Sequence, residues 1–276
     1  MTSKVLQDDA RVTAAFRGEA IYGDDFSDSE IRQWFADEVH GYSSLEHEDA
    51  RNPVYAYGAL DAKYAWPHLP PVISEALGLG SAYGLEFVQL AGKVQSLTIV
   101  EPEQKFWTDQ VAGIPARYEM PASDGRLPYQ ADRFGLVTAF GVLHHIPNVS
   151  AVFGELCRVL RPGGLLILRE PIVSMGDWRS SRPGLTARER GLPVGCVRDL
   201  ARSHGMHLRA EHQIGFGPWL KLCNKLAASS VWNNSSFVGI DRTLSAAFRW
   251  NYRYHRTTTW QRFAPTVGVW VCEKHV

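Results

Sequence analysis

Residues 158–171, RVLRPGGLLILREP, are the feature that most constrains the fold. Residues 158–160 close an apolar helical stretch. The helix cannot continue through Pro162-Gly163-Gly164, because proline lacks the N–H donor and glycine favours a tight turn. Residues 165–168 are wholly apolar, which is typical of a strand buried on both faces. Helix, turn and buried strand in this order indicate an α/β fold.

Short apolar runs alternate with helical stretches from Val72 onward. This alternation predicts a mostly parallel sheet with helices on both faces. The predicted strands are 72–77, 96–100, 134–140 and 164–169, and the predicted helices are 83–91, 103–112 and 149–160. A further helix at 194–204 is followed by a strand at 206–214 and a last strand at 266–273.

Two segments lie outside this alternation. Residues 1–71 are predicted to form an N-terminal helical extension that contributes to the cover of an active site. Ser27 and Glu30 have capping-box spacing before a helix at 28–40, and a second helix is expected near 55–65. Residues 217–265 are too long for a hairpin loop and contain four tryptophans. This cap insertion is predicted to be a lid, and the alternative is a helical appendage that only completes packing.

The composition excludes several classes of protein. Lysine plus arginine equals aspartate plus glutamate, 29 each among 276 residues, so no global field attracts nucleic acid or anionic membranes, although a local basic patch remains possible. The N-terminus has no apolar signal region, and no 18-residue apolar run occurs. The four cysteines form no CxxC pair and are expected to be small buried hydrophobic residues. We therefore expect a cytoplasmic protein without membrane insertion.

The segment GLGSAYG, residues 78–84, follows the first predicted strand. Glycines there let the backbone turn tightly and approach a ligand closely. Glu101 ends the second strand, 21 residues after Gly80, where an acid can accept hydrogen bonds from both ribose hydroxyls of an adenosine ligand. The alternative is a tight turn beside a surface glutamate. A dinucleotide would place its pyrophosphate at this helix start, whereas S-adenosylmethionine (SAM) carries no phosphate.

The later motifs distinguish these two ligands. SDGRLPY (123–129), FGVLHHIPN (140–148) and RPGG (161–164) resemble, in this order, class I SAM-dependent methyltransferases, in particular the small-molecule branch of the type 11 kind. The resemblance covers about residues 72–171. It implies a Rossmann-like seven-stranded sheet with an antiparallel final strand, a SAM-binding methyltransferase domain over 72–276, and S-adenosylhomocysteine (SAH) as the product.

The resemblance also assigns roles to residues. Gly78 and Gly80 would lie against the methionine part of SAM, and Glu101 would hold the ribose. The remaining predicted cofactor-binding residues are Ser81 and Pro102, Ser123 or Asp124 at the adenine edge, and Phe140 and Gly141 as pocket lining. The family's usual acid two residues before the first glycine is Ala76 here, its third glycine is Ala82, and its usual aspartate before the fourth strand is Gly135. These departures bear on cofactor affinity rather than on the fold.

The histidine pair is the predicted catalytic feature. A hydroxyl acceptor must lose a proton as the methyl group moves, and histidine suits that role near neutral pH. We favour His144 over His145 as the base; the alternative is that one histidine only caps a strand end. Glu170, at the end of the fifth strand, and Tyr254, in the cap, are predicted to contact substrate. Alternatively, Glu170 is a solvated surface residue and Tyr254 belongs to the core of the cap. No metal site is predicted.

The sequence thus predicts SAM-dependent O-methylation of a small-molecule or saccharide acceptor. The saccharide assignment rests on the overall resemblance alone. One alternative is a degenerate SAM- or SAH-binding protein without transfer activity, which Ala76 motivates. The other is an NAD(P)-dependent oxidoreductase with a Rossmann fold. No nucleic-acid partner is expected, and a homodimer is possible.

Overall fold

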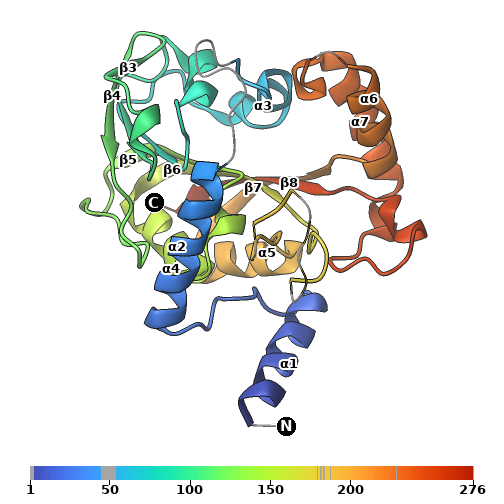
Figure 1. The fold of residues 1–276 in the computed structure, drawn as a ribbon. Helices are drawn as coiled ribbons and strands as arrows, with labels where there is room; N and C mark the ends of the chain where they lie inside the picture. Colours follow the sequence, from blue (N-terminus) through green and yellow to red (C-terminus); the bar gives the residue numbers. More distant parts are fainter. Residues whose placement is uncertain are drawn as a thin grey trace.

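An eight-stranded sheet forms the centre of the computed structural model (Figure 1). The structure describes residues 3–44, 54–178, 180, 182, 184–186, 188–227 and 229–275. The strand order is β3-β4-β2-β1-β5-β6-β8-β7. The strands are β1 Ala76–Leu79, β2 Leu97–Val100, β3 Gln110–Val111, β4 Ile114–Glu119, β5 Phe134–Phe140, β6 Leu160–Pro171, β7 Met206–Ile214 and β8 Val267–Lys274.

The sheet is mostly parallel, as predicted. Strands β4, β2, β1, β5 and β6 pair in parallel, and β8 lies antiparallel between β6 and β7. The carboxyl ends of β1, β2, β5 and β6 therefore meet at one edge, where open α/β sheets bind ligands. The eighth strand is the short β3, which pairs with β4 through the turn at Ala112-Gly113, both with positive φ.

Both faces of the sheet are buried. Side chains alternate along each strand, so neighbouring residues of one strand point to opposite faces. In β6, Leu166 and Leu168 pack with α4 (Val149–Val159) and α5 (Val194–Ser203). Leu165 and Ile167 pack on the other face with the 3₁₀ helices η1 (Trp66–His68) and η2 (Leu85–Leu90). Alternate residues of one strand thus fill two separate cores.

Two predicted helices after the first strands are wrong in type. Where a helix was predicted at 83–91, the structure has the 3₁₀ helix η2 (Leu85–Leu90), which follows Gly84 at φ +67°. Residues 103–112 contain only a 3₁₀ turn, η3 (Gln104–Phe106), followed by β3. The hairpin to β4 uses this segment as an edge strand, so tertiary pairing overrides its helical pattern.

The N-terminal segment contributes α1 (Ser3–Phe16) and α2 (Asp28–Ser44), and the latter confirms the predicted helix at 28–40. The capping contact forms, since the Glu30 carboxylate accepts the Ser27 N–H at 2.8 Å. Trp34 of α2 is fully buried, and its indole donates to the His145 carbonyl oxygen at 2.8 Å. This bond fixes α2 against the loop that follows β5.

The insertion at 217–265 packs at a different place. It forms α6 (Gly217–Leu226), η5 (Val231–Asn233), α7 (Ser235–Ala247), η6 (Arg249–Asn251) and η7 (Trp260–Arg262). Trp232 and Phe237 pack there against Leu60 and Tyr64 of α3 (Gly58–Tyr64). Figure 1 shows α6 and α7 beside α3, on the other side of the molecule from α2 and α4. Within the described ranges, no helix is both long and apolar enough to cross a bilayer.

Candidate functional site

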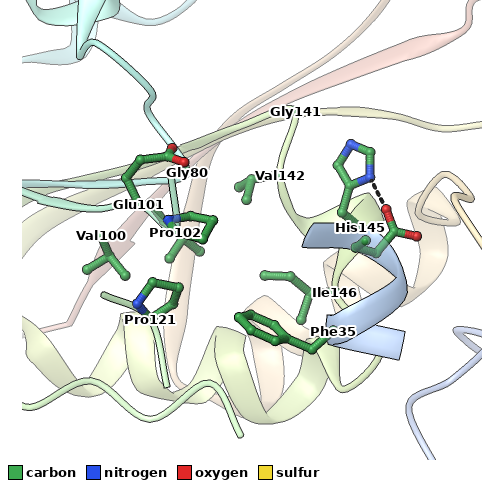
Figure 2. A pocket seen from close by; sticks show the side chains of 12 residues that line it. Phe35, Gly80, Val100, Glu101, Pro102, Pro121, Gly141, Val142, His145 and Ile146 are labelled. Carbon is green, nitrogen blue, oxygen red and sulfur yellow. Dashed lines mark hydrogen bonds and ion pairs between the residues drawn. The ribbon is translucent and has the colours of Figure 1, made fainter. Parts of the chain in front are cut away.

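A cleft opens at the carboxyl edge of the sheet, between the ends of β1, β2 and β5 on one side and α2 on the other. Figure 2 shows Glu101 and His145 on opposite sides of it. It is lined by Phe35, Glu38, Leu79, Gly80, Val100, Glu101, Pro102, Pro121, Gly141, Val142, His145 and Ile146. An adjoining hollow shares six of these residues and continues to Ser123 and Val152. The structure thus brings five predicted cofactor residues, Gly80, Glu101, Pro102, Ser123 and Gly141, into one continuous depression.

Glu101 is 1% exposed and held in place by backbone donors. One carboxylate oxygen accepts the Ala82 N–H at 2.9 Å, and the other accepts the Glu103 N–H at 3.1 Å. Burial raises the pKa of this carboxyl. Each carboxylate oxygen can accept a second hydrogen bond. Glu101 can therefore bind two hydroxyl groups without giving up its own supports.

The turn after β1 needs glycine at position 80. Gly80 has φ +60°, and a Cβ placed on it would collide with the Val142 side chain. This close approach joins the glycine turn to the loop after β5, whose Gly141 has φ +68°. Gly78 differs, since it lies within β1, is buried and does not line the cleft.

His145 is the histidine that lines the cleft. Its Nδ1 lies 2.9 Å from the Glu38 carboxylate of α2, drawn as the dashed line in Figure 2. The other Glu38 oxygen accepts the Thr186 hydroxyl at 2.8 Å. A carboxylate on Nδ1 fixes the ring and its tautomer, which leaves Nε2 as the acceptor. The sequence did not reveal Glu38, which is 107 residues from its partner.

His144 does not line the cleft, so its predicted orientation is wrong. Its Nδ1 lies 2.7 Å from Glu170, and its Nε2 lies 3.6 Å from Glu189. Burial opposes the charged ring, but the hydrogen bond to Glu170 and the nearby Glu189 carboxylate raise the pKa of His144 to about 9. The imidazole is therefore protonated at neutral pH and has no free lone pair with which to act as a base.

Glu170 also differs from its predicted role as a substrate contact. It is fully buried, and one oxygen accepts the N–H groups of Val142 at 3.0 Å and Leu143 at 2.9 Å. Its other oxygen binds His144. Glu170 thus shapes the loop after β5 and does not reach the cleft.

His144, His145 and Glu189 also present donor atoms within 4.8 Å of one another, and no other group of three metal-type donors occurs among the described residues. Imidazole and carboxylate donors suit divalent transition metals. The described geometry instead pairs His144 with two carboxylates, so a metal ion would have to displace a proton from that ring.

The other predicted residues lie outside the cleft. The Asp124 carboxylate faces solvent and accepts from the Arg126 N–H at 3.0 Å, which together with the Arg126 side chain lowers its pKa. Tyr254 is buried, and its hydroxyl donates to the Gly191 carbonyl oxygen at 2.7 Å. Ser81 and Phe140 line a second cavity, on the other side of Gly80.

This second cavity contains Glu86, a residue that the sequence did not single out. Glu86 is 5% exposed, and burial raises its pKa to about 7. The charges acting on it are Arg169 of β6 and Asp61 of α3. These two form an ion pair of 2.5 Å, so they neutralise each other and leave Glu86 without a cationic partner of its own among the described residues.

Comparison with known proteins supports the predicted family. Residues 77–168 match the methyltransferase domain family. A sterol 4-C-methyltransferase of Caenorhabditis elegans is 31% identical over 98 residues, which cover 34% of this chain and 29% of that protein. A ubiquinone biosynthesis O-methyltransferase of Xanthomonas axonopodis pv. citri is 24% identical over 123 residues, which cover 43% and 52%. The match thus spans about half or less of each relative.

Solved structures share the fold. The crystal structure of the [4+2]-cyclase SpnF superposes with a TM-score of 0.52 at 13% identity, covering 91% of this chain and 98% of that one. A Listeria monocytogenes protein described as SAM-dependent methyltransferase gives 0.51 at 12% identity, covering 76% and 95%. The Rossmann-like class I fold predicted from the sequence is confirmed, and the match to the methyltransferase domain family lies within it, at residues 77–168.

Proposed function

We propose that this protein transfers the methyl group of SAM to a hydroxyl group of a small-molecule or saccharide acceptor. The observation that supports this most is the cleft, in which a buried carboxylate and a glycine turn face a carboxylate-oriented histidine. The relatives include both C- and O-methyltransferases, so the O-methylation rests on the histidine geometry rather than on similarity.

The cleft and its surroundings offer a partner for each part of the cofactor. Glu101 accepts from the ribose hydroxyls, and Ser123 in the adjoining hollow lies at the adenine end. The methionine part lies at Gly80, between the cleft and the second cavity. There the Glu86 carboxylate binds the ammonium group of the methionine part. It takes the place of the family's usual acid, whose position is occupied by Ala76 in this chain.

His145 acts as the general base. Methyl transfer is an in-line displacement with a neutral sulfur leaving group, so the enzyme needs no acid and mainly aligns the reactants. Glu38 holds Nδ1–H and leaves Nε2 to accept the hydroxyl proton. Phe35 and Glu38 line the cleft, so α2 contributes to the cover of the reaction.

The test begins with mass spectrometry of ligand released from the purified protein, followed by a metabolite screen with labelled SAM. With the acceptor found, His145→Asn should lower kcat about 100-fold or more, the usual range of base catalysis, while SAH affinity changes little. Glu38→Gln should lower kcat less, because the base remains but its tautomer is less well fixed. Full activity of His145→Asn would remove the histidine base.

A second candidate is a SAM- or SAH-binding protein that transfers no methyl group. Ala76 motivates it, and the fold shared with a [4+2]-cyclase shows that fold alone does not decide the reaction. Bound SAM that stays intact with every acceptor in the screen, and in long incubations, would favour this candidate over the transferase.

A further inference from the structure

The insertion at 217–265 is strongly basic, although the whole chain is neutral. It contains seven lysine and arginine residues and a single acid, Asp241. Asp241 is buried and accepts the N–H groups of Gly215 at 2.8 Å and Phe216 at 2.7 Å. This carboxylate therefore supports the start of α6 and does not neutralise the surface cations.

Three of these cations line one pocket. It has a volume of about 510 Å³ and lies between the loop after β6, the first turn of α6 and the segment 254–263. The lining residues include Lys221, Arg256 and Arg262 together with Ser174 and Thr259, and no carboxylate of the described chain lines it. The pocket shares no residue with the cofactor cleft.

Among the described residues, the cations in this pocket have no counter-ion. Lys221, Arg256 and Arg262 form no ion pair with a described residue. One Arg256 nitrogen donates to the Pro265 carbonyl oxygen at 2.7 Å, but its Nε has no acceptor in the described structure. Burial and the neighbouring Arg262 both lower the pKa of Arg256, so the two guanidinium groups repel each other.

The N-terminus of α6 adds to this positive potential. Gly217 and Pro218, its first residues, line the same pocket. The N-terminal end of a helix carries about half a positive charge, which favours anions. Guanidinium and ammonium groups with nearby hydroxyls are the usual partners of phosphate oxygens.

We propose that this pocket binds the phosphate group of a phosphorylated ligand. SAM carries no phosphate, so the ligand is not the cofactor. The phosphate can come from a soluble phosphate ester or from a lipid headgroup. The side chains of Trp250 and Trp260 in the same insertion are 66% and 55% exposed, with ring centroids 6.5 Å apart, and exposed tryptophans suit a membrane interface.

The experiment compares two charge-matched double variants of the full chain. Lys221→Gln with Arg262→Gln removes two exposed cations from the pocket. Lys225→Gln with Arg253→Gln removes two exposed cations of the insertion that do not line it. The probes are glycerol 3-phosphate, followed by calorimetry, and vesicles of phosphatidylglycerol compared with phosphatidylcholine, followed by co-sedimentation.

The wild type and the control variant (Lys225→Gln with Arg253→Gln) should bind at least one of the two kinds of phosphate probe. The pocket variant (Lys221→Gln with Arg262→Gln) should bind the same probe at least tenfold more weakly. Binding of glycerol 3-phosphate assigns a soluble ester, and binding of anionic vesicles alone assigns a headgroup. Absence of binding to both probes, or equal weakening in the two variants, would overturn the proposal. SAH affinity, measured in the same samples, should not change, so the result does not depend on methyl transfer.

Discussion

The adjacent histidines have different surroundings, although they are neighbours in the sequence. His145 faces the cleft, whereas His144 is enclosed by two carboxylates. The sequence identified the pair but placed His144, rather than His145, at the cleft. The alternation of side chains that holds along a strand does not apply here, because residues 143–145 form a 3₁₀ turn. Their partners, Glu38 and Glu189, are distant in sequence and carry no local signal.

His144 should make stability depend on pH. Its pKa is about 9 in the folded protein and near 6.5 when unfolded, so its contribution is complete below pH 6.5 and is lost as the pH rises through 9. We expect a loss on the order of 3 kcal/mol in the free energy of unfolding between pH 6 and pH 10. Urea unfolding of the wild type and His144→Gln measures this loss, which should be absent in the variant. Equal pH slopes would contradict the pairing.

Glu86 should control the pH dependence of cofactor binding. Its pKa is about 7 in the free protein, so the carboxylate that binds an ammonium group forms as the pH rises through 7. SAH affinity should therefore increase between pH 6 and pH 8. In Glu86→Gln the affinity should be about tenfold lower at pH 8, and the increase should disappear, because one charge-assisted hydrogen bond is lost. An unchanged pH profile in that variant would place the methionine group elsewhere.

At the scale of elements, the sequence predicted the positions of helices and strands better than it predicted which kind of element each segment forms. The helices at 28–40, 149–160 and 194–204 and the strand at 206–214 are confirmed to within a few residues. The β3–β4 hairpin was missed because its turn places Ala112, a residue with a Cβ, at φ +49°. Gly113 is a turn signal, but an alanine before it is not the residue expected at such a φ. The glycine turn was found because Gly80 meets a strict steric requirement.

Substitution of Gly80 should destabilise this turn for two reasons, backbone strain and a steric collision, which a second substitution can separate. Gly80→Ala combines a left-handed φ, at about 1–2 kcal/mol, with a collision against Val142. We expect a lower Tm and weaker SAH binding. The double variant with Val142→Ala should recover part of the Tm, because it removes the collision and leaves the backbone strain. Absence of any recovery would show that Val142 does not limit position 80.

At the scale of the molecule, the predicted lid is not seen over the cleft. No described residue of the insertion lines the cleft, and the insertion instead buries apolar side chains of α3 and β8. The tryptophan-rich composition that suggested a lid is divided between this core and the surface. Sequence alone could not distinguish the two, because both uses need aromatic side chains.

Two tryptophans of the insertion should therefore respond differently. Trp232 is buried against Phe237, so Trp232→Ala should destabilise the protein by about 3–5 kcal/mol. Trp250 is largely exposed, so Trp250→Ala should change stability by less than about 0.5 kcal/mol. Denaturant unfolding of both variants checks this. A small effect of Trp232→Ala on stability would contradict a structural role of the insertion and favour a detachable lid.

The most direct test of the central claim is calorimetric titration of SAH into the wild type, Glu101→Ala and Glu103→Ala. Glu101 should bind the ribose through charge-assisted hydrogen bonds of about 1.5–3 kcal/mol each, so Glu101→Ala should bind at least tenfold more weakly. Glu103 does not line the cleft, and its backbone N–H is retained in the variant, so its affinity should match the wild type. Because Glu101 also supports two N–H groups, folding is verified by circular dichroism, and the titration is run at low temperature. Unchanged affinity in folded Glu101→Ala, or no binding by the wild type, would contradict the assignment of this cleft to SAM.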